Sequence, residues 1–216
     1  MDDATTAPAP LGRREQRKQE THRAIRDAAL DLALAHGMES LTVDAIADAA
    51  GVSPRTFFNY FSCKEDALVP ETSEATSAFR RSILARPPEE PPVRALRAGI
   101  VRCYRLGEVR LDRERLQARQ RLVHQHLPLL TRQLAQYVSL EQGLAEVLAE
   151  RLDAEPDDLR PALLAAVAVG ILRVSIRRWT VDPSHPLEQQ IDAAFAELEQ
   201  EDVAAPPVPA PPEVLS

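Results

Sequence analysis

The side chains with the most informative chemistry lie in residues 53–64, which read SPRTFFNYFSCK. Within this stretch, Arg55 can donate two hydrogen bonds to the edge of guanine, and Asn59 can form a similar bidentate pair with adenine. Both side chains reach base edges only if a helix carries them into the major groove of DNA. The surrounding sequence must therefore build such a helix.

Residues 42–61 carry the signals of two short helices joined by a tight turn. The hydroxyl of Thr42 can cap the first helix, and apolar residues then recur at helical spacing. Gly51 ends this helix, because glycine accepts the left-handed conformation of a tight exit. Ser53 and Pro54 start the second helix as a side-chain cap followed by proline at the first helical position. The pattern predicts a helix-turn-helix, whose second helix has the size that enters the major groove.

The second helix should have one buried face and one open face. Phe57 and Phe61 are four residues apart and share a face, which we expect to be core. Arg55 and Asn59 lie away from that face, and Phe58 lies at its flank. Because the Phe58 ring has no hydrogen-bonding atom, its best contact with DNA is a thymine methyl group. The alternative is that Phe58 also belongs to the core.

This stretch resembles the DNA-binding domain of the TetR family of bacterial transcriptional regulators. The resemblance rests on the run TFFNYF over residues 56–61, followed by Lys64, and it extends over residues 14–68. It implies that some exposed residues contact base edges, namely Arg55, Phe58 and Asn59. It also implies that other residues contact the phosphate backbone, namely Thr42, Thr56, Tyr60 and Lys64.

The basic start of the first predicted helix belongs with these candidates. Arg14 and Lys18 lie in a lead-in rich in arginine and lysine. By itself such a run favours a solvated helix start. Beside a helix-turn-helix it favours contacts with DNA phosphates, so we add Arg14 and Lys18 to the predicted backbone contacts.

The composition predicts an all-α protein, and the resemblance implies an N-terminal three-helix helix-turn-helix domain that binds DNA. Glycine is scarce, with 7 in 216 residues, and the gaps between helix-breaking residues are long. We expect a disordered arm over residues 1–12 and a helix-turn-helix domain over residues 13–68. The resemblance implies that a helical ligand-binding and dimerisation domain follows over residues 69–201, and we expect a disordered proline-rich tail over residues 202–216. After the helix-turn-helix, the predicted helices cover residues 63–84, 93–107, 111–124, 128–152, 156–179 and 186–200.

The last two predicted helices are candidates for a dimer interface. Alanine and glycine make residues 162–170 unusually small-sided, which a buried core helix would explain. The family resemblance implies more, namely that helices over about residues 157–180 and 186–200 pair with their copies. One short recognition helix reads few base pairs, whereas two related by a two-fold axis read a palindrome. We therefore expect a homodimer on a double-stranded DNA operator.

Arginine is dense between residues 94 and 121, and two interpretations are open. One is a solvated surface, and the other is a site for an anionic effector such as an acyl-CoA thioester or another carboxylate. The helix that ends in Arg177-Arg178-Trp179 resembles TetR-family members with an acyl-CoA-like effector domain. The candidate pocket residues are Arg97, Ile100, Tyr104, Leu134, Tyr137 and Trp179.

The sequence offers no set of residues for an enzyme, a cofactor or a metal. It lacks the G-x-S-x-G, Walker and G-x-G-x-x-G motifs, so we expect no catalytic residues. His124 and His126 are two residues apart, point in different directions on a helix, and have no cluster to complete a zinc site. Cys63 precedes Lys64, where a thiol could act as a redox switch. The alternative is that Cys63 is an inert side chain.

Other sequence features indicate the cellular compartment of the protein. No apolar run approaches the roughly 20 residues of a membrane span, and the acidic, proline-containing start differs from a signal peptide. Two cysteines are too few for a disulfide framework. We therefore expect a cytoplasmic protein. The net charge of −7 argues against indiscriminate DNA coating but permits a local footprint.

Taken together, these features predict a sequence-specific DNA-binding transcriptional regulator. We expect a ligand-responsive repressor that binds a palindromic operator as a dimer. An activator, or a ligand-independent regulator of the same fold, is the alternative. An enzyme or interaction module built on the helical domain is a second alternative, and the absence of a nucleophile–base set argues against it.

Overall fold

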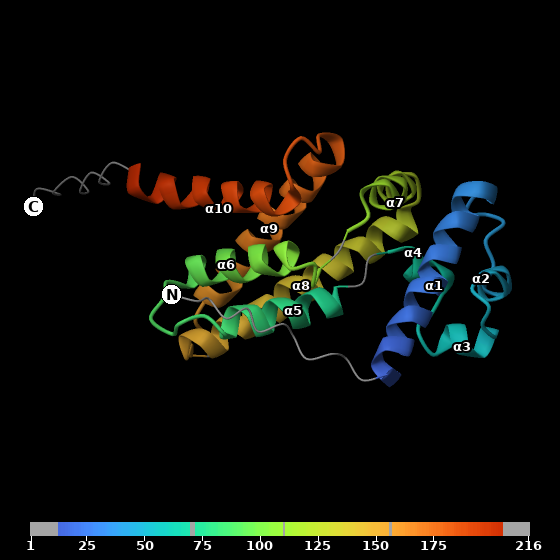
Figure 1. Cartoon of the computed structure of the whole chain (residues 1–216), viewed down its shortest axis with the longest axis horizontal. Helices are drawn as coiled ribbons and strands as arrows, with labels where there is room; N and C mark the ends of the chain where they lie inside the picture. The colour runs from blue at the N-terminus through green and yellow to red at the C-terminus, as the bar shows by residue number, and fades with distance from the viewer. Residues whose placement is uncertain (1–12, 70–71, 110, 156, 205–216) are drawn as a thin grey trace, which may run out of the picture. The chain divides into compact units, whose positions relative to one another are not determined.

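The computed structural model describes residues 13–69, 72–109, 111–155 and 157–204. In these residues the chain forms ten helices, α1 to α10, and no strand (Figure 1). The predicted all-α fold is confirmed. The chain divides into two compact units, one made of Met1–Pro70 and Glu114–Ala135, and the other of Glu71–Arg113 and Gln136–Ser216.

The first unit is a helical domain completed by a segment from the middle of the chain. Ile25 and Phe57, from its N-terminal part, share a fully buried apolar cluster with Leu129. Burying an apolar side chain of this size contributes about 1.5–3 kcal/mol. The segment 114–135 therefore helps to stabilise the first unit. The helices of this unit are α1 (Arg13–His36), α2 (Val43–Ala49), α3 (Pro54–Phe58) and α4 (Lys64–Leu68), with most of α7 (Arg113–Gln125) and the beginning of α8 (Leu127–Leu152).

The second unit is a helical bundle around a larger apolar cluster. It consists of α5 (Ser73–Leu84), α6 (Pro92–Arg105), the remainder of α8, α9 (Arg160–Val181) and α10 (Leu187–Ala204). Helix α6 packs against α5 and α10, and α10 also packs against α9. Phe79, Leu144 and Phe195 are buried in the cluster. Helices α5 and α6 approach so closely that a Cβ atom at Gly99 would lie 2.7 Å from Cγ1 of Ile83.

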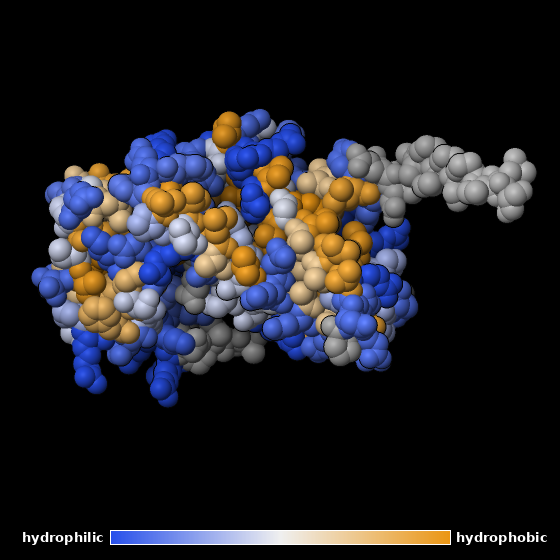
Figure 2. All heavy atoms as spheres, turned by 180° about the vertical axis from the view of Figure 1, so that it is seen from behind, coloured by the Kyte–Doolittle hydropathy of each residue, from blue (hydrophilic) through white to orange (hydrophobic). Residues whose placement is uncertain are grey.

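A row of large apolar side chains on α9 is exposed. Leu163, Val167 and Val174 are 62, 45 and 43% exposed, and their spacing places them on one face of the helix. Figure 2, which views the molecule from behind, shows apolar side chains gathered in an orange patch on this side of the second unit. This row is a candidate interaction surface.

Two predicted helix boundaries are wrong, and proline explains both. The sequence predicts one helix over residues 63–84, whereas α4 and α5 are separate helices. Val69 is extended, with φ −94° and ψ 139°, because a following proline disfavours helical backbone in the residue before it. Helix α9 begins at Arg160 rather than at residue 156. There Asp158 Oδ1 accepts a hydrogen bond of 2.8 Å from the Arg160 N–H, and Pro161 occupies the first turn.

The loop between α5 and α6 is held by one side chain of α8. The guanidinium of Arg151 donates hydrogen bonds to four main-chain carbonyl oxygens, which are those of Ile83 at 3.4 Å, Arg86 at 3.2 Å, Glu90 at 3.0 Å, and Pro87. The fork of donors on arginine suits such a set of acceptors. The loop therefore has a fixed conformation in front of α6.

The predicted terminal segments lie mostly beyond what the structure describes. Helix α10 continues to Ala204, so residues 202–204 of the predicted tail are helical. The remainder of that tail and the predicted arm over residues 1–12 lie outside the described residues.

Candidate nucleic-acid interface

Helices α2 and α3 have the capping interactions that the sequence predicts. Thr42 Oγ1 accepts a hydrogen bond of 3.2 Å from the Ala45 N–H, and Ser53 Oγ accepts one of 3.1 Å from the Thr56 N–H. Gly51 has a φ of 68°, the left-handed conformation that glycine adopts without strain. Each short helix therefore begins at a side-chain cap, and the turn between them is made at Gly51.

Helix α3 divides into a buried face and an exposed face. Phe57 is fully buried, whereas Phe58 is 58% exposed, and their rings meet edge to face with centroids 5.5 Å apart. Arg55 and Asn59 are also exposed. The structure thus brings the three predicted base-contacting residues to one open surface. The exposure of Phe58 favours a DNA contact over the alternative core position.

An aromatic contact that the sequence did not indicate joins the residues after α3 to α1. The imidazole of His22 stacks on the buried ring of Phe61, with centroids 4.7 Å apart and an interplanar angle of 25°. The ring of Tyr60 lies 6.2 Å from the same imidazole. Helical periodicity alone could not have found His22, because the contact joins residues far apart in sequence.

Most of the predicted phosphate contacts are accessible. Arg14, Lys18 and Thr42 are exposed, and Tyr60 is half-buried. The hydroxyl of Thr56 lies 2.9 Å from Ser53 Oγ, which orients it at the start of α3. These residues remain predictions as DNA contacts, and their exposure is what such contacts require.

Lys64 has a structural role that the sequence did not reveal. Its Nζ donates hydrogen bonds to the carbonyl oxygens of Met38 at 3.2 Å and Leu41 at 2.7 Å. These carbonyls belong to the connection between α1 and α2. The ammonium therefore closes that connection and keeps one of its three donors for another acceptor.

Asp66 joins α4 to the beginning of α8. Its carboxylate accepts hydrogen bonds from the backbone N–H of Ser62 at 3.2 Å, from the Ser62 hydroxyl, and from Arg132. Burial alone raises the pKa of Asp66, but the hydrogen bond from Ser62 and the charge of Arg132 outweigh it and place the pKa below its usual value. The carboxylate is thus charged where it holds these groups together.

Cys63 lies beside this cluster. Burial raises the pKa of its thiol. Because the thiolate is the form that oxidises readily, this environment favours the inert alternative over the redox switch.

Four of the six candidate effector residues gather in the second unit. Ile100, Tyr104, Tyr137 and Trp179 all belong to its apolar cluster. Burial raises the pKa of Tyr104 well above its usual value, so its phenol is neutral. The guanidinium of Arg173 lies 5.2 Å from the centre of the Tyr137 ring, a cation–π distance.

The other two candidates lie elsewhere. Leu134 is exposed and belongs to the first unit. Arg97 pairs with Asp192 and Glu199 of α10. An arginine held by two carboxylates is committed to joining α6 to α10.

The described residues contain no group of three or more histidine, cysteine or acidic side chains that could hold a metal ion. His124 Nδ1 lies 2.7 Å from the carbonyl oxygen of Gln120, one turn earlier in α7. No helix within the described part of the chain has the length and apolarity that crossing a bilayer requires.

Two stretches of the chain match known protein families. Residues 25–69 match the family described as "Bacterial regulatory proteins, tetR family", and residues 90–202 match the "MftR C-terminal domain". The first match contains α2, α3 and α4, and the second contains α6 to α9 and most of α10.

Similar proteins extend over nearly the whole chain. The HTH-type transcriptional regulator TcmR of Streptomyces glaucescens is 34% identical over 202 residues, which cover 87% of this chain and 88% of TcmR. MftR of Mycobacterium tuberculosis is 29% identical over 182 residues, which cover 83% of this chain and 90% of MftR. The crystal structure of Thermus thermophilus FadR, a TetR-family transcriptional repressor in complex with lauroyl-CoA, matches with a TM-score of 0.52 and 25% identity. This match covers 88% of this chain and 98% of FadR.

Proposed function

This chain belongs to the TetR family of bacterial regulatory proteins and is a DNA-binding transcriptional regulator, and from this premise we propose that it is a ligand-responsive repressor that binds a palindromic operator as a homodimer. The family is not a family of enzymes. We place its action in the cytoplasm, where the operator DNA is.

The observation that carries the proposal is the open surface of α3. Arg55, Phe58 and Asn59 are exposed there, while Phe57 beside them is buried. Arginine and asparagine have the donor and acceptor geometry for guanine and adenine, and an aromatic ring can contact a thymine methyl group. Arg14, Lys18, Thr42, Thr56, Tyr60 and Lys64 supply the contacts to phosphates, which fix the register without reading sequence.

The exposed apolar row on α9 supports the homodimer. Leu163, Val167 and Val174 are large apolar side chains in water in the single chain, and a second copy of the same surface would bury them. Helix α10 packs against α9 and extends the proposed interface. A two-fold axis through this interface relates two recognition helices, which matches the symmetry of a palindrome.

The effector is proposed to be an acyl-CoA-like thioester. FadR of Thermus thermophilus, whose fold this chain shares, binds lauroyl-CoA. In this chain Ile100, Tyr104, Tyr137 and Trp179 belong to one apolar cluster, whose character suits an acyl chain. The effector acts by binding one state of the dimer more tightly than the other, which shifts the population away from the DNA-binding state.

Selection of bound DNA from a random pool by the purified protein, at two salt concentrations, tests the proposal. A palindromic site enriched at both concentrations would support a dimeric sequence reader. Binding that vanishes at the higher salt without an enriched sequence would contradict it, because such binding is non-specific. Transcription from a promoter carrying the selected site then separates a repressor from an activator, and release by lauroyl-CoA separates a ligand-responsive regulator from a ligand-independent one.

A further inference from the structure

Helices α9 and α10 carry charges of opposite sign. Every charged residue of α9 is an arginine, and every charged residue of α10 is acidic. The two helices pack against each other and run in opposite directions, because only the short connection 182–186 joins them. The pair therefore consists of a basic helix beside an acidic one.

Two arginines of α9 border its exposed apolar row. Arg173 and Arg177 are exposed and one helical turn apart, so they lie on the same side of α9. Val174, which follows Arg173, belongs to the apolar row. Neither arginine forms an ion pair with a described residue, and the guanidinium of Arg173 lies over the ring of Tyr137. Both positive charges are therefore available beside the apolar row.

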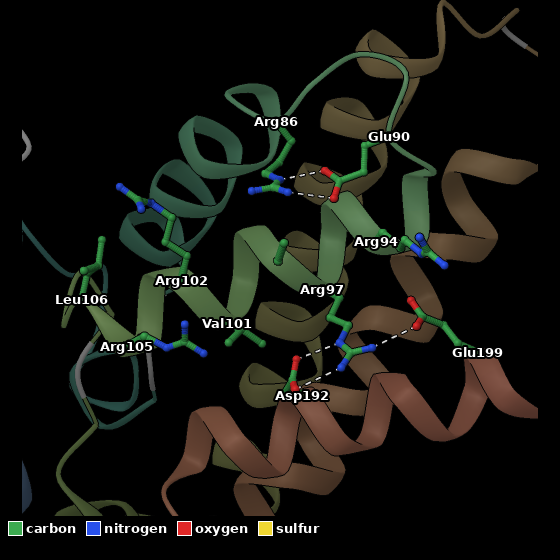
Figure 3. Close-up of a pocket in the computed structure, with 11 residues that line it drawn as sticks. Arg86, Glu90, Arg94, Arg97, Val101, Arg102, Arg105, Leu106, Asp192 and Glu199 are labelled. Carbon is green, nitrogen blue, oxygen red and sulfur yellow. Dashed lines mark hydrogen bonds and ion pairs between the residues drawn. The ribbon is translucent and has the colours of Figure 1, made fainter. Parts of the chain in front are cut away.

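The acidic residues of α10 lie on more than one side of the helix. Asp192 and Glu199 point toward α6, where both accept hydrogen bonds from Arg97 (Figure 3). Phe195 is buried in the apolar cluster. At about 100° per residue, Glu197 lies about 160° around the helix from Glu199. Glu197 is exposed and forms no ion pair with a described residue, so it presents a carboxylate on the open side of α10.

The open side of α10 is small beside Glu197. Ala193, one helical turn earlier, is exposed, and Ala196 is half-buried. The distance between two packed helices depends on the side chains at the contact, and alanine allows a close approach. A helix with large apolar side chains can therefore pack on this side of α10.

The open charges of α9 and α10 lie at heights that a two-fold axis can match. The hydroxyl of Ser175 donates a hydrogen bond of 3.5 Å to the carbonyl oxygen of Gln190, which places these two residues at the same height. Arg173 and Arg177 are each within about 3 Å of that height, and Glu197 lies about 10 Å further along α10. A two-fold axis beside the middle of α9 therefore brings Glu197 of one copy level with the two arginines of the other.

We infer that α9 of one copy packs on α10 of its partner, and that Arg173 and Arg177 pair with Glu197 of the partner subunit. A two-fold interface is isologous, so this contact occurs twice. Packing of α9 on α9 would bring only positive charges together, which opposes association. The inference rests on the proposed homodimer, and it adds the order of the helices and the charges that select a second copy of this chain as the partner.

Charge reversal tests the pairing, with sedimentation velocity as the measure of dimer formation. Arg173→Glu/Arg177→Glu places acids opposite Glu197 of the partner subunit, and Glu197→Arg places a base opposite the two arginines. Each variant alone should therefore dimerise at least about tenfold more weakly than the wild type. Arg121→Glu, a charge reversal on the exposed surface of α7, should dimerise like the wild type.

A mixture of the two variants should restore the dimer. In the mixed dimer the introduced acids of one α9 meet the introduced base, and the arginines of the other α9 meet the original Glu197, so both contacts are attractive. We expect a heterodimer with about the affinity of the wild type, and a damaged fold would not be restored by mixing. Raising the salt concentration from about 0.1 to 1 M should strengthen the dimer of each variant alone, because it shortens the screening length from roughly 10 to 3 Å.

Other outcomes would overturn the inference. If Glu197→Arg dimerises like the wild type, Glu197 does not face the partner. If Arg173→Glu/Arg177→Glu binds the wild type more tightly than the wild type binds itself, α9 packs on α9. A dimeric wild type whose two variants form no heterodimer would refute the charge pairing and leave the proposed homodimer intact. A wild type that is monomeric at every concentration would contradict both.

Discussion

The Nζ atom of Lys64 donates a hydrogen bond of 2.7 Å to the carbonyl oxygen of Leu41, 23 residues earlier in the chain. A second hydrogen bond goes to Met38. Because an ammonium group has three donors, the same side chain can close the connection before α2 and still contact a phosphate. Lys64 is thus expected to matter for stability as well as for DNA affinity.

Replacing Lys64 by methionine keeps the length of the side chain and removes its donors. We expect Lys64→Met to lower the free energy of unfolding by about 1–3 kcal/mol, since two partly buried carbonyls lose a charged partner. Urea denaturation measures this change. The control Lys18→Met, at an exposed position, should stay within about 0.5 kcal/mol. Both variants should reduce the salt slope of DNA binding by about 1. Equal stability of the two variants would contradict a structural role for Lys64.

Asn59→Ala should cost sequence discrimination rather than overall affinity. Removing a bidentate contact to one base should reduce the difference between operator and mismatched DNA by roughly 1–3 kcal/mol. Competition binding with single-base variants of the selected site measures the difference. Lys18→Met serves as the comparison, because loss of a phosphate contact should weaken all sequences alike. Full discrimination in Asn59→Ala would show that Asn59 does not read a base.

The neighbours Phe57 and Phe58 should respond in opposite ways to alanine. Phe57 is fully buried, so Phe57→Ala should destabilise the protein by about 3–5 kcal/mol. Phe58 is mostly exposed, so Phe58→Ala should change stability by about 0.5 kcal/mol or less while weakening operator binding. Thermal unfolding and DNA titration on the same samples separate the two effects. Equal destabilisation by both variants would place Phe58 in the core.

Leu163→Glu should dissociate the proposed homodimer. A carboxylate in the middle of an apolar interface is costly unless it is paired. Sedimentation velocity should therefore show monomer at concentrations where the wild type is a dimer. Leu34→Glu makes the same exchange at an exposed leucine of α1 and should leave the oligomeric state unchanged. A dimeric Leu163→Glu protein would place the interface elsewhere.

The ion pair between Arg97 and Asp192 should affect how the stability of the protein falls as the pH is lowered, which is the acid limb of the stability profile. The hydrogen bond from Arg97 lowers the pKa of Asp192 in the folded state. The pair therefore adds stability above the usual carboxyl pKa of about 4, and this contribution is lost as the pH falls through the folded-state pKa. Thermal unfolding between about pH 2 and 6 should thus depend less on pH in Asp192→Asn. Arg97→Gln should flatten the same limb, because it removes the group that lowers the pKa of Asp192. Unaltered pH dependence in both would contradict the assignment.

The parts of the fold that depend on neighbouring residues could be predicted from the sequence. The caps at Thr42 and Ser53 and the left-handed turn at Gly51 act within one helical turn, so the residue types alone located the helix-turn-helix. The two boundary errors came from Pro70 and Pro161, whose effects on adjacent backbone are also local but were given too little weight.

The parts that depend on distant residues could not be predicted in the same way. The Lys64 contact with Leu41 and the His22 stack on Phe61 both join different helices. Arg97 was a predicted pocket residue, yet its partners come from α10, 95 and 102 residues later. Periodicity assigns a side chain to a face of its helix, but the element that covers the face is set by the tertiary fold.

Helix α8 belongs to both compact units, with residues 127–135 in the first and 136–152 in the second. The apolar core of the first unit includes Leu122 and Val123 of α7 and Leu129 of α8. A chimaera that joined residues 1–70 of this chain to the remainder of a relative would replace those three side chains with foreign ones. A single crossover near residue 70 therefore cannot exchange the first unit intact, and a chimaera keeps its core only if residues 114–135 move with the N-terminal segment.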